Sequence, residues 1–105
     1  MRPLLALLLA PLALTACMQS TPPHRAIYTT PEMNGLDAVR PYPYSFDVCQ
    51  LLNPNEATQA FTVPANRKMI GCPTHETGAI KDRIDMNGGK VLGQVKMWTI
   101  LEVSH

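Results

Sequence analysis

The sequence has few charged residues and no excess of either sign. Its 105 residues include nine Lys or Arg and eight Asp or Glu, and no basic cluster stands out. Nucleic-acid binding and adhesion to anionic lipid both depend on clustered basic side chains. We therefore expect no nucleic-acid partner and no polybasic membrane surface.

Several motifs that carry chemistry are also missing. The sequence contains no Cys-x-x-Cys pair for a redox site or haem attachment, and no His-Glu-x-x-His run for catalytic zinc. Its one Gly-Gly pair, in Asn87-Gly88-Gly89, lacks the spacing and the Lys-Ser/Thr ending of a phosphate-binding loop. Together these absences predict a protein that is not an enzyme and holds no cofactor or metal.

Long apolar runs are scarce as well, and the longest lies at the N-terminus. Arg2 is followed by an apolar run of about a dozen residues, Pro3 to Leu14. This run is shorter than the ~20 residues that cross a hydrocarbon core. Its length, and the small residues Thr15 and Ala16 that follow it, are typical of an export signal.

The end of this run, Leu14-Thr15-Ala16-Cys17, resembles the lipobox of bacterial lipoproteins. In that class the cysteine thiol receives a diacylglycerol, the signal is cleaved just before it, and the new amine is acylated. The resemblance implies a signal peptide over residues 1–16 and a lipid on Cys17, and two or more acyl chains anchor a protein stably. Met18 stands where an Asp would resemble an inner-membrane retention signal. The expected location is therefore the outer membrane of a bacterial envelope, facing the periplasm.

Cysteine is scarce too, and the lipobox accounts for one of the three. The remaining pair, Cys49 and Cys72, is expected to form a disulfide in an oxidising periplasm. The bridge would close a loop of 24 residues, which stabilises by roughly 3 kcal/mol in the chain-entropy model. Removal of residues 1–16 leaves 89 of the 105 residues, which is enough for one small domain. A domain of this size has a limited core, so a disulfide would add to its stability.

Prolines divide the remaining chain in two. Residues 17–43 hold five of them, and prolines at this density favour an extended chain. We therefore predict a lipidated cysteine and a proline-rich tether over residues 17–43, in which residues 26–30 could pair on a sheet edge and residues 36–39 could make one helical turn. The compact domain is expected over residues 44–105.

The pattern within residues 44–105 predicts a small β-rich domain, with α+β as the alternative. Alternating apolar residues favour a strand at 44–48, and Asn55 is a candidate cap for a short helix over residues 56–60. Three further elements are expected: strands at 61–63 and 68–70, and a turn at 71–73.

Residues 79–86 fit two periods equally well. Ala79, Ile80 and Ile84 have helical spacing, and Gly88 would then end a helix. Ile80, Ile84 and Met86 also fit a period of two, and residues 87–89 would then form a hairpin turn. We favour the strand.

The clearest element is an extended segment over residues 91–103. Its apolar residues lie mostly on one face, with Trp98 and Ile100 on the other, mixed face, and Gly93 marks a bend or bulge. A strand of this kind suits a small sheet covered on one face. Trp98 is expected either to fill the second side of the core or, with Ile100, to anchor a protein partner, since Trp is enriched at interface hot spots.

The only cluster of chemically capable side chains follows the second cysteine of the pair. Cys72, His75 and Glu76, with Cys49, offer a nucleophile and base or ligands for zinc. An enzyme of this kind needs an orienting third group and structural zinc needs a second ligand pair, and the sequence indicates neither. A disulfide would also remove the Cys72 thiol.

Three functional hypotheses follow. The first is a lipid-anchored, non-enzymatic interaction or structural module with a protein partner in an envelope assembly. The second is an inhibitor or small-ligand-binding lipoprotein that presents a rigid, protruding loop at residues 73–78. The third is a metal-binding or thiol protein that uses Cys72 and His75.

Overall fold

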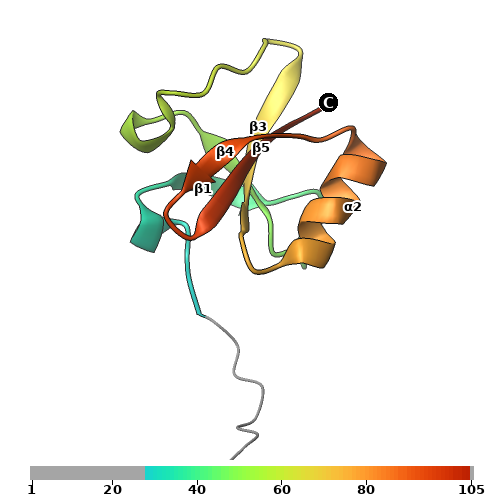
Figure 1. Ribbon diagram of the computed structural model, residues 1–105, viewed down its shortest axis with the longest axis horizontal. Helices are drawn as coiled ribbons and strands as arrows, with labels where there is room; N and C mark the ends of the chain where they lie inside the picture. Colours follow the sequence, from blue (N-terminus) through green and yellow to red (C-terminus); the bar gives the residue numbers. More distant parts are fainter. Residues whose placement is uncertain (1–27, 105) are drawn as a thin grey trace, which may run out of the picture.

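The computed structural model describes residues 28–104. These residues form one small β-rich domain with five antiparallel strands in a single sheet and one α-helix (Figure 1), so the predicted fold class is confirmed. The elements are η1 (Glu32–Asn34), β1 (Asp37–Pro41), β2 (Gln50–Asn53), η2 (Glu56–Thr58), β3 (Arg67–Pro73), α2 (Thr77–Asn87), β4 (Lys90–Val95) and β5 (Trp98–Ser104). The signal peptide expected at 1–16 and the lipid site Cys17 lie outside the described residues.

The sheet is built around β3 and β5. Its strand order is β1-β2-β3-β5-β4, and β3 pairs with β5 along its whole length. The edge strands β1 and β4 each contain a bulge, and the β4 bulge lies beside Gly93, as the sequence predicted. A Cβ atom at Gly93 would come within 2.6 Å of the Phe61 ring, which is why a residue without a side chain occupies this position.

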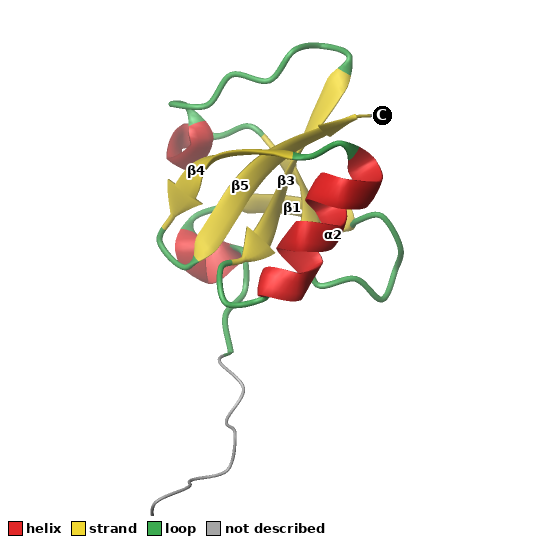
Figure 2. Cartoon of the chain, turned by 45° about the vertical axis from the view of Figure 1, so that its right-hand side comes forward, coloured by secondary structure: helices red, strands yellow, loops and turns green. Residues whose placement is uncertain are grey.

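Both faces of the sheet are covered, which corrects the expectation of one covered face. Figure 2 shows α2 lying across one face, where it packs on a cluster that contains the two disulfide cysteines. The other face is covered by residues from η2 and from the connections that follow η1 and η2. Buried side chains on the helix side are Tyr42, Cys49, Ile70, Cys72, Leu101 and Val103, and those on the other side are Leu36, Leu52, Met69, Trp98 and Ile100.

The preferred strand at 79–86 is wrong, because these residues belong to the helix α2. Ala79 and Ile80 pack against the core, and Arg83, one turn further on, is also buried. The helix ends at Asn87 and is capped by Gly88, which has a φ of 62° and donates its N–H to the Arg83 carbonyl. The helical alternative with a Gly88 cap was therefore correct.

The single extended segment at 91–103 is in fact a hairpin. β4 and β5 are joined by Lys96 and Met97, and Val95 pairs directly with Trp98. Lys96 takes a φ of 51°. Such a turn usually carries Gly, Asn or Asp, so the sequence offered no signal for a break at this point.

Some of the remaining local predictions are wrong and others are confirmed. The strand at 44–48 is wrong because the Asp47 N–H donates to the Tyr44 carbonyl over 3.0 Å and makes a turn. Residues 61–63 also lie outside the strands, and the turn at 71–73 is the end of β3. The strand at 68–70 and the Asn55 cap are confirmed, although the capped helix is one turn of 3-10 helix.

The predicted tether boundary at residue 43 is also corrected. Residues 37–41 are the edge strand β1 rather than a helical turn, and Asn34 is buried, with 3% exposed. The Asn34 amide nitrogen donates to the Thr29 hydroxyl (2.8 Å) and the Thr30 carbonyl (2.7 Å), and its oxygen accepts the Met97 N–H (2.9 Å). The fold therefore includes the chain from Thr29 onward, and residues 17–27 of the expected tether lie outside the described part.

Asn34 gives a first prediction. Asn34→Ala is expected to lower the free energy of unfolding by about 1–3 kcal/mol, because the partly buried Met97 N–H loses its acceptor and the bonds from the buried Asn34 amide to Thr29 and Thr30 are lost. The loss can be measured by urea unfolding. Asn53→Ala is the matched control, since the Asn53 amide is exposed and bonds only Asp37 at 3.3 Å. Equal losses in the two variants would contradict a role for Asn34 in fixing the N-terminal segment.

Candidate functional site

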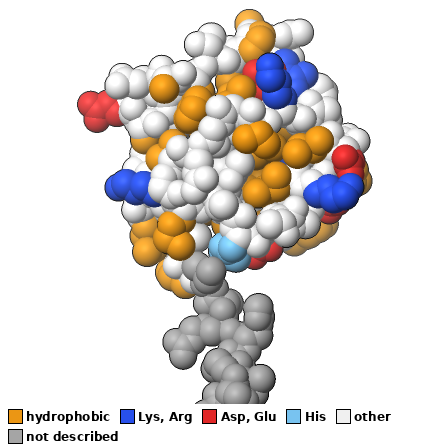
Figure 3. Space-filling model, viewed as in Figure 1, with side chains coloured by type: hydrophobic (Ala, Val, Ile, Leu, Met, Phe, Trp, Pro, Cys, Tyr) orange, Lys and Arg blue, Asp and Glu red, His pale blue; other side chains and the backbone are white. Residues whose placement is uncertain are grey.

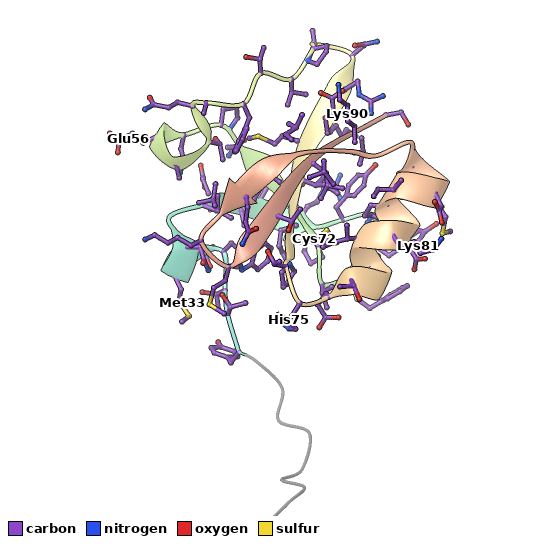
Figure 4. All side chains as sticks on the ribbon, viewed as in Figure 1. Met33, Glu56, Cys72, His75, Lys81 and Lys90 are labelled. Carbon is purple, nitrogen blue, oxygen red and sulfur yellow. A yellow bond between two sulfur atoms is a disulfide. The ribbon has the colours of Figure 1, made fainter. Side chains whose placement is uncertain are left out.

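The Cys49–Cys72 disulfide is present, as the sequence predicted. Both cysteines are buried, and the bridge joins the residue before β2 to the middle of the sheet. Figure 4 places Cys72 in the interior of the domain and His75 at its surface. In this state Cys72 has no thiol, so it acts neither as a nucleophile nor as a metal ligand.

The Cys72, His75 and Glu76 cluster does not assemble into a site. The Glu76 N–H donates to the Pro73 carbonyl at 2.9 Å, which makes a tight turn between β3 and α2. The His75 ring lies beside Glu76, with Nε2 3.5 Å from the carboxylate oxygen. Within residues 28–104, no three His, Cys, Asp or Glu side chains are close enough to hold a metal ion.

The same turn occupies residues 73–78, where a rigid, protruding loop was expected under the inhibitor hypothesis. Pro73 ends β3 and Thr77 begins α2, so three residues connect the two elements. Thr74 holds this connection against the sheet, since its N–H donates to the Met97 carbonyl and its hydroxyl lies 2.9 Å from the Thr99 hydroxyl. Residues 74–76 therefore form a short connection held on the sheet rather than a long protruding loop.

Trp98 and Ile100 both lie in the core, with 2% and 0% of their surface exposed. The Trp98 indole Nε1 donates to the Thr29 hydroxyl at 3.2 Å, so even its polar edge is satisfied internally. Their face of β5 looked only partly apolar in sequence, but it is covered by residues distant in sequence, including Leu36 and Phe61. Trp98 therefore fills the second side of the core, and the expectation of a partner anchor at Trp98 and Ile100 is wrong.

The most distinctive exposed feature is a pair of aromatic rings between β1 and β2. Tyr44 and Phe46 are 60% and 80% exposed. Their ring centroids are 5.5 Å apart and the rings are nearly parallel, at 17°. Val48, also exposed, follows in the same connection. We call residues 42–49 the aromatic loop.

The aromatic loop is held at both ends and in the middle. Tyr42 is buried and donates its N–H to the Cys49 carbonyl at 2.9 Å, next to the disulfide. At the turn, the Tyr44 N–H donates to the Asp47 carboxylate at 2.8 Å. That carboxylate also faces Arg83 of α2, at 3.7 Å. Because the support is fixed in advance, a ligand of the two rings would order little of the chain.

No family model, no curated protein and no solved structure matches this sequence. The role of the aromatic loop must therefore follow from its geometry and surroundings.

Val48 and Tyr28 line one shallow pocket of about 300 Å³ together with His75 and Glu76. This volume lies at the lower end of small-molecule sites. Within the described residues, no helix is both long and apolar enough to cross a membrane.

The Asp47–Arg83 pair gives a second prediction. Removal of the carboxylate in Asp47→Ala leaves the largely buried Arg83 guanidinium without its counter-charge, and we expect a loss of about 1–3 kcal/mol. Arg83→Met removes the charge and keeps an aliphatic chain, so its expected cost is smaller. Chemical unfolding of both variants tests this order, and a greater loss in Arg83→Met would contradict it.

Proposed function

We propose that this chain is a lipid-anchored, periplasm-facing protein of the bacterial cell envelope that acts as a non-enzymatic interaction or structural module. Cys17 carries the anchor, and the folded domain contacts other envelope components. The four lipobox residues support the anchor. The buried disulfide supports an oxidising compartment.

The aromatic loop is the observation that carries the interaction role. The domain buries its Trp98 and four large aliphatic side chains almost completely, yet Tyr44 and Phe46 remain in solvent. Exposed aromatic side chains on a rigid support are typical of contact surfaces, because little conformational entropy is lost on binding. This favours a surface that binds over one that reacts.

The anchor is tested by labelling cells with radioactive palmitate. The wild-type chain is expected to carry the label and to sediment with membranes, and Cys17→Ala is expected to lose both properties. The double variant Cys49→Ala/Cys72→Ala is the matched control, because it also loses thiols but keeps Cys17. Label retained in Cys17→Ala would overturn the anchor.

The protein partner is tested by crosslinking in intact cells. Lys81, Lys90 and Lys96 are exposed and lie outside the aromatic loop, so an amine-reactive crosslinker can capture a neighbour without disturbing the two rings. A defined adduct, seen with the wild type and reduced by Lys→Arg changes at these positions, supports an envelope assembly. Absence of any adduct at native expression would contradict a protein partner.

A further inference from the structure

We propose that the aromatic loop and the apolar side chains around it rest on the surface of the bilayer that holds the anchor. The inference deepens the proposed function and rests on it, since it takes Cys17 to be lipidated. The proposed binding partner of the aromatic loop is the interfacial region of a lipid membrane.

The first step is the position of the aromatic loop relative to the start of the described chain. We call this end of the domain the entry end. Figure 4 places Met33 and His75 there and Lys90 at the opposite end. Val48 of the aromatic loop lines the same pocket as Tyr28, the first described residue, and His75. The aromatic loop therefore adjoins the entry end.

The second step is the distribution of exposed apolar side chains. Ten large ones are exposed among the described residues, and six of them lie in the aromatic loop or at the entry end, where Tyr28 and Met97 each line a pocket with His75. In Figure 3, hydrophobic side chains lie near the single described histidine at the lower edge of the domain. The six are Tyr28, Met33, Tyr44, Phe46, Val48 and Met97.

The third step is chemistry. Tyrosine side chains favour the membrane–water interface, where an apolar ring and a polar hydroxyl are both accommodated. The charges at this end are of both signs and form no basic patch: Glu32 lies beside Met33, Lys96 beside Met97, Asp47 faces Arg83, and Glu76 lies beside His75. A surface of this kind suits an interface reached through rings rather than one bound through a basic patch.

The fourth step is the distance that the chain between Cys17 and the domain can span. Cys17 precedes Tyr28 by eleven residues, which span at most about 40 Å even when fully extended. A lipid on Cys17 therefore keeps the entry end close to the bilayer at all times. The tether makes contact an intramolecular event with a high effective concentration, so the membrane has an advantage over a freely diffusing protein or a second copy.

A pair of tryptophan variants tests the contact. Phe46→Trp puts a fluorophore in the aromatic loop. Met86→Trp puts one near the end of α2, where the Met86 side chain is 70% exposed. That end lies at the far side of the domain, because Gly88 accepts a hydrogen bond from Arg67 at the start of β3. The native Trp98 is buried, so its emission serves as an internal reference for folding.

The experiment uses the full lipidated chain in vesicles of phosphatidylethanolamine and phosphatidylglycerol with brominated acyl chains. We expect the added emission of Phe46→Trp to shift to shorter wavelength and to lose most of its intensity. The added emission of Met86→Trp is expected to remain unshifted and unquenched. Adding Tyr44→Ser and Val48→Ser to the Phe46→Trp chain is expected to restore much of the lost emission.

Three results would overturn the inference. Equal behaviour at positions 46 and 86 in vesicle-bound chain would remove the orientation while leaving the anchor intact. A blue shift at position 46 without lipid would show that another protein surface or a second copy covers the rings. A chain that fails to remain with the vesicles lacks the anchor, and the proposed function then fails together with the inference before any emission is compared.

Discussion

Trp98→Ala is expected to destabilise the domain strongly rather than to weaken a partner contact. Replacement of a buried tryptophan by alanine costs about 3–5 kcal/mol, and a small domain has only ~5–15 kcal/mol in total. Trp98 lies in the second core cluster, and its ring packs against Gly71, where an added Cβ would come within 3.2 Å of it. In a domain of this size the loss lowers Tm by roughly 12–40 °C.

The matched control is Trp98→Phe, which keeps an aromatic ring in the same cluster and loses the hydrogen bond to Thr29. It is expected to cost less than half as much. Thermal unfolding followed by far-UV circular dichroism separates the two variants. If Trp98→Ala melted within a few degrees of the wild type and lost a bound partner, the tryptophan would be an anchor after all, and the core assignment would be wrong.

Loss of the disulfide is expected to be the other large effect. The two cysteines are 23 positions apart, and opening a loop of this length costs about 3 kcal/mol in the chain-entropy model, with ~2–5 kcal/mol typical of small secreted domains. The double variant Cys49→Ala/Cys72→Ala is expected to show this loss in urea unfolding. It also frees one end of the aromatic loop, so protease cleavage near residues 44–48 is expected to rise.

Comparison with the reduced wild type separates the bridge from the side chains. Reduction under unfolding conditions keeps both sulfurs, so its cost reports the crosslink alone. Cys17→Ala is expected to leave stability unchanged, because Cys17 lies outside the bridge. A double variant as stable as the oxidised wild type would show that core packing suffices without the staple.

The fold class and the disulfide could be predicted from the sequence because each depends on counts and local pattern. The individual elements were harder wherever two structures use the same residues. Ala79, Ile80 and Ile84 satisfy helical spacing, and Ile80 and Ile84 also satisfy a strand, and only packing of the first two on the core decides between them. The hairpin turn at Lys96 could not be predicted, because this lysine has a positive φ, a backbone conformation in which Gly, Asn or Asp is usually found.

The candidate site could not be predicted for a related reason. The alternation of Tyr44, Phe46 and Val48 has the period of a half-buried strand, but the Asp47 turn removes this segment from the sheet and leaves its apolar side chains in solvent. Trp98 shows the converse, since the residues that bury it come from other parts of the chain. Burial by residues that are distant in sequence cannot be predicted from local periodicity.

Asn34 also has a mechanical consequence. A chain fixed to a membrane by its N-terminal side is loaded from that side, and without Asn34 the tension would fall on β1, an edge strand that pairs only with β2. Edge strands unzip pair by pair. The Asn34 amide instead ties the entry segment to Met97, which directly precedes the interior strand β5. If Cys17 carries the proposed lipid anchor, a pull on that anchor would reach the pair of strands with the most extensive pairing, β3 and β5, rather than the edge strand β1.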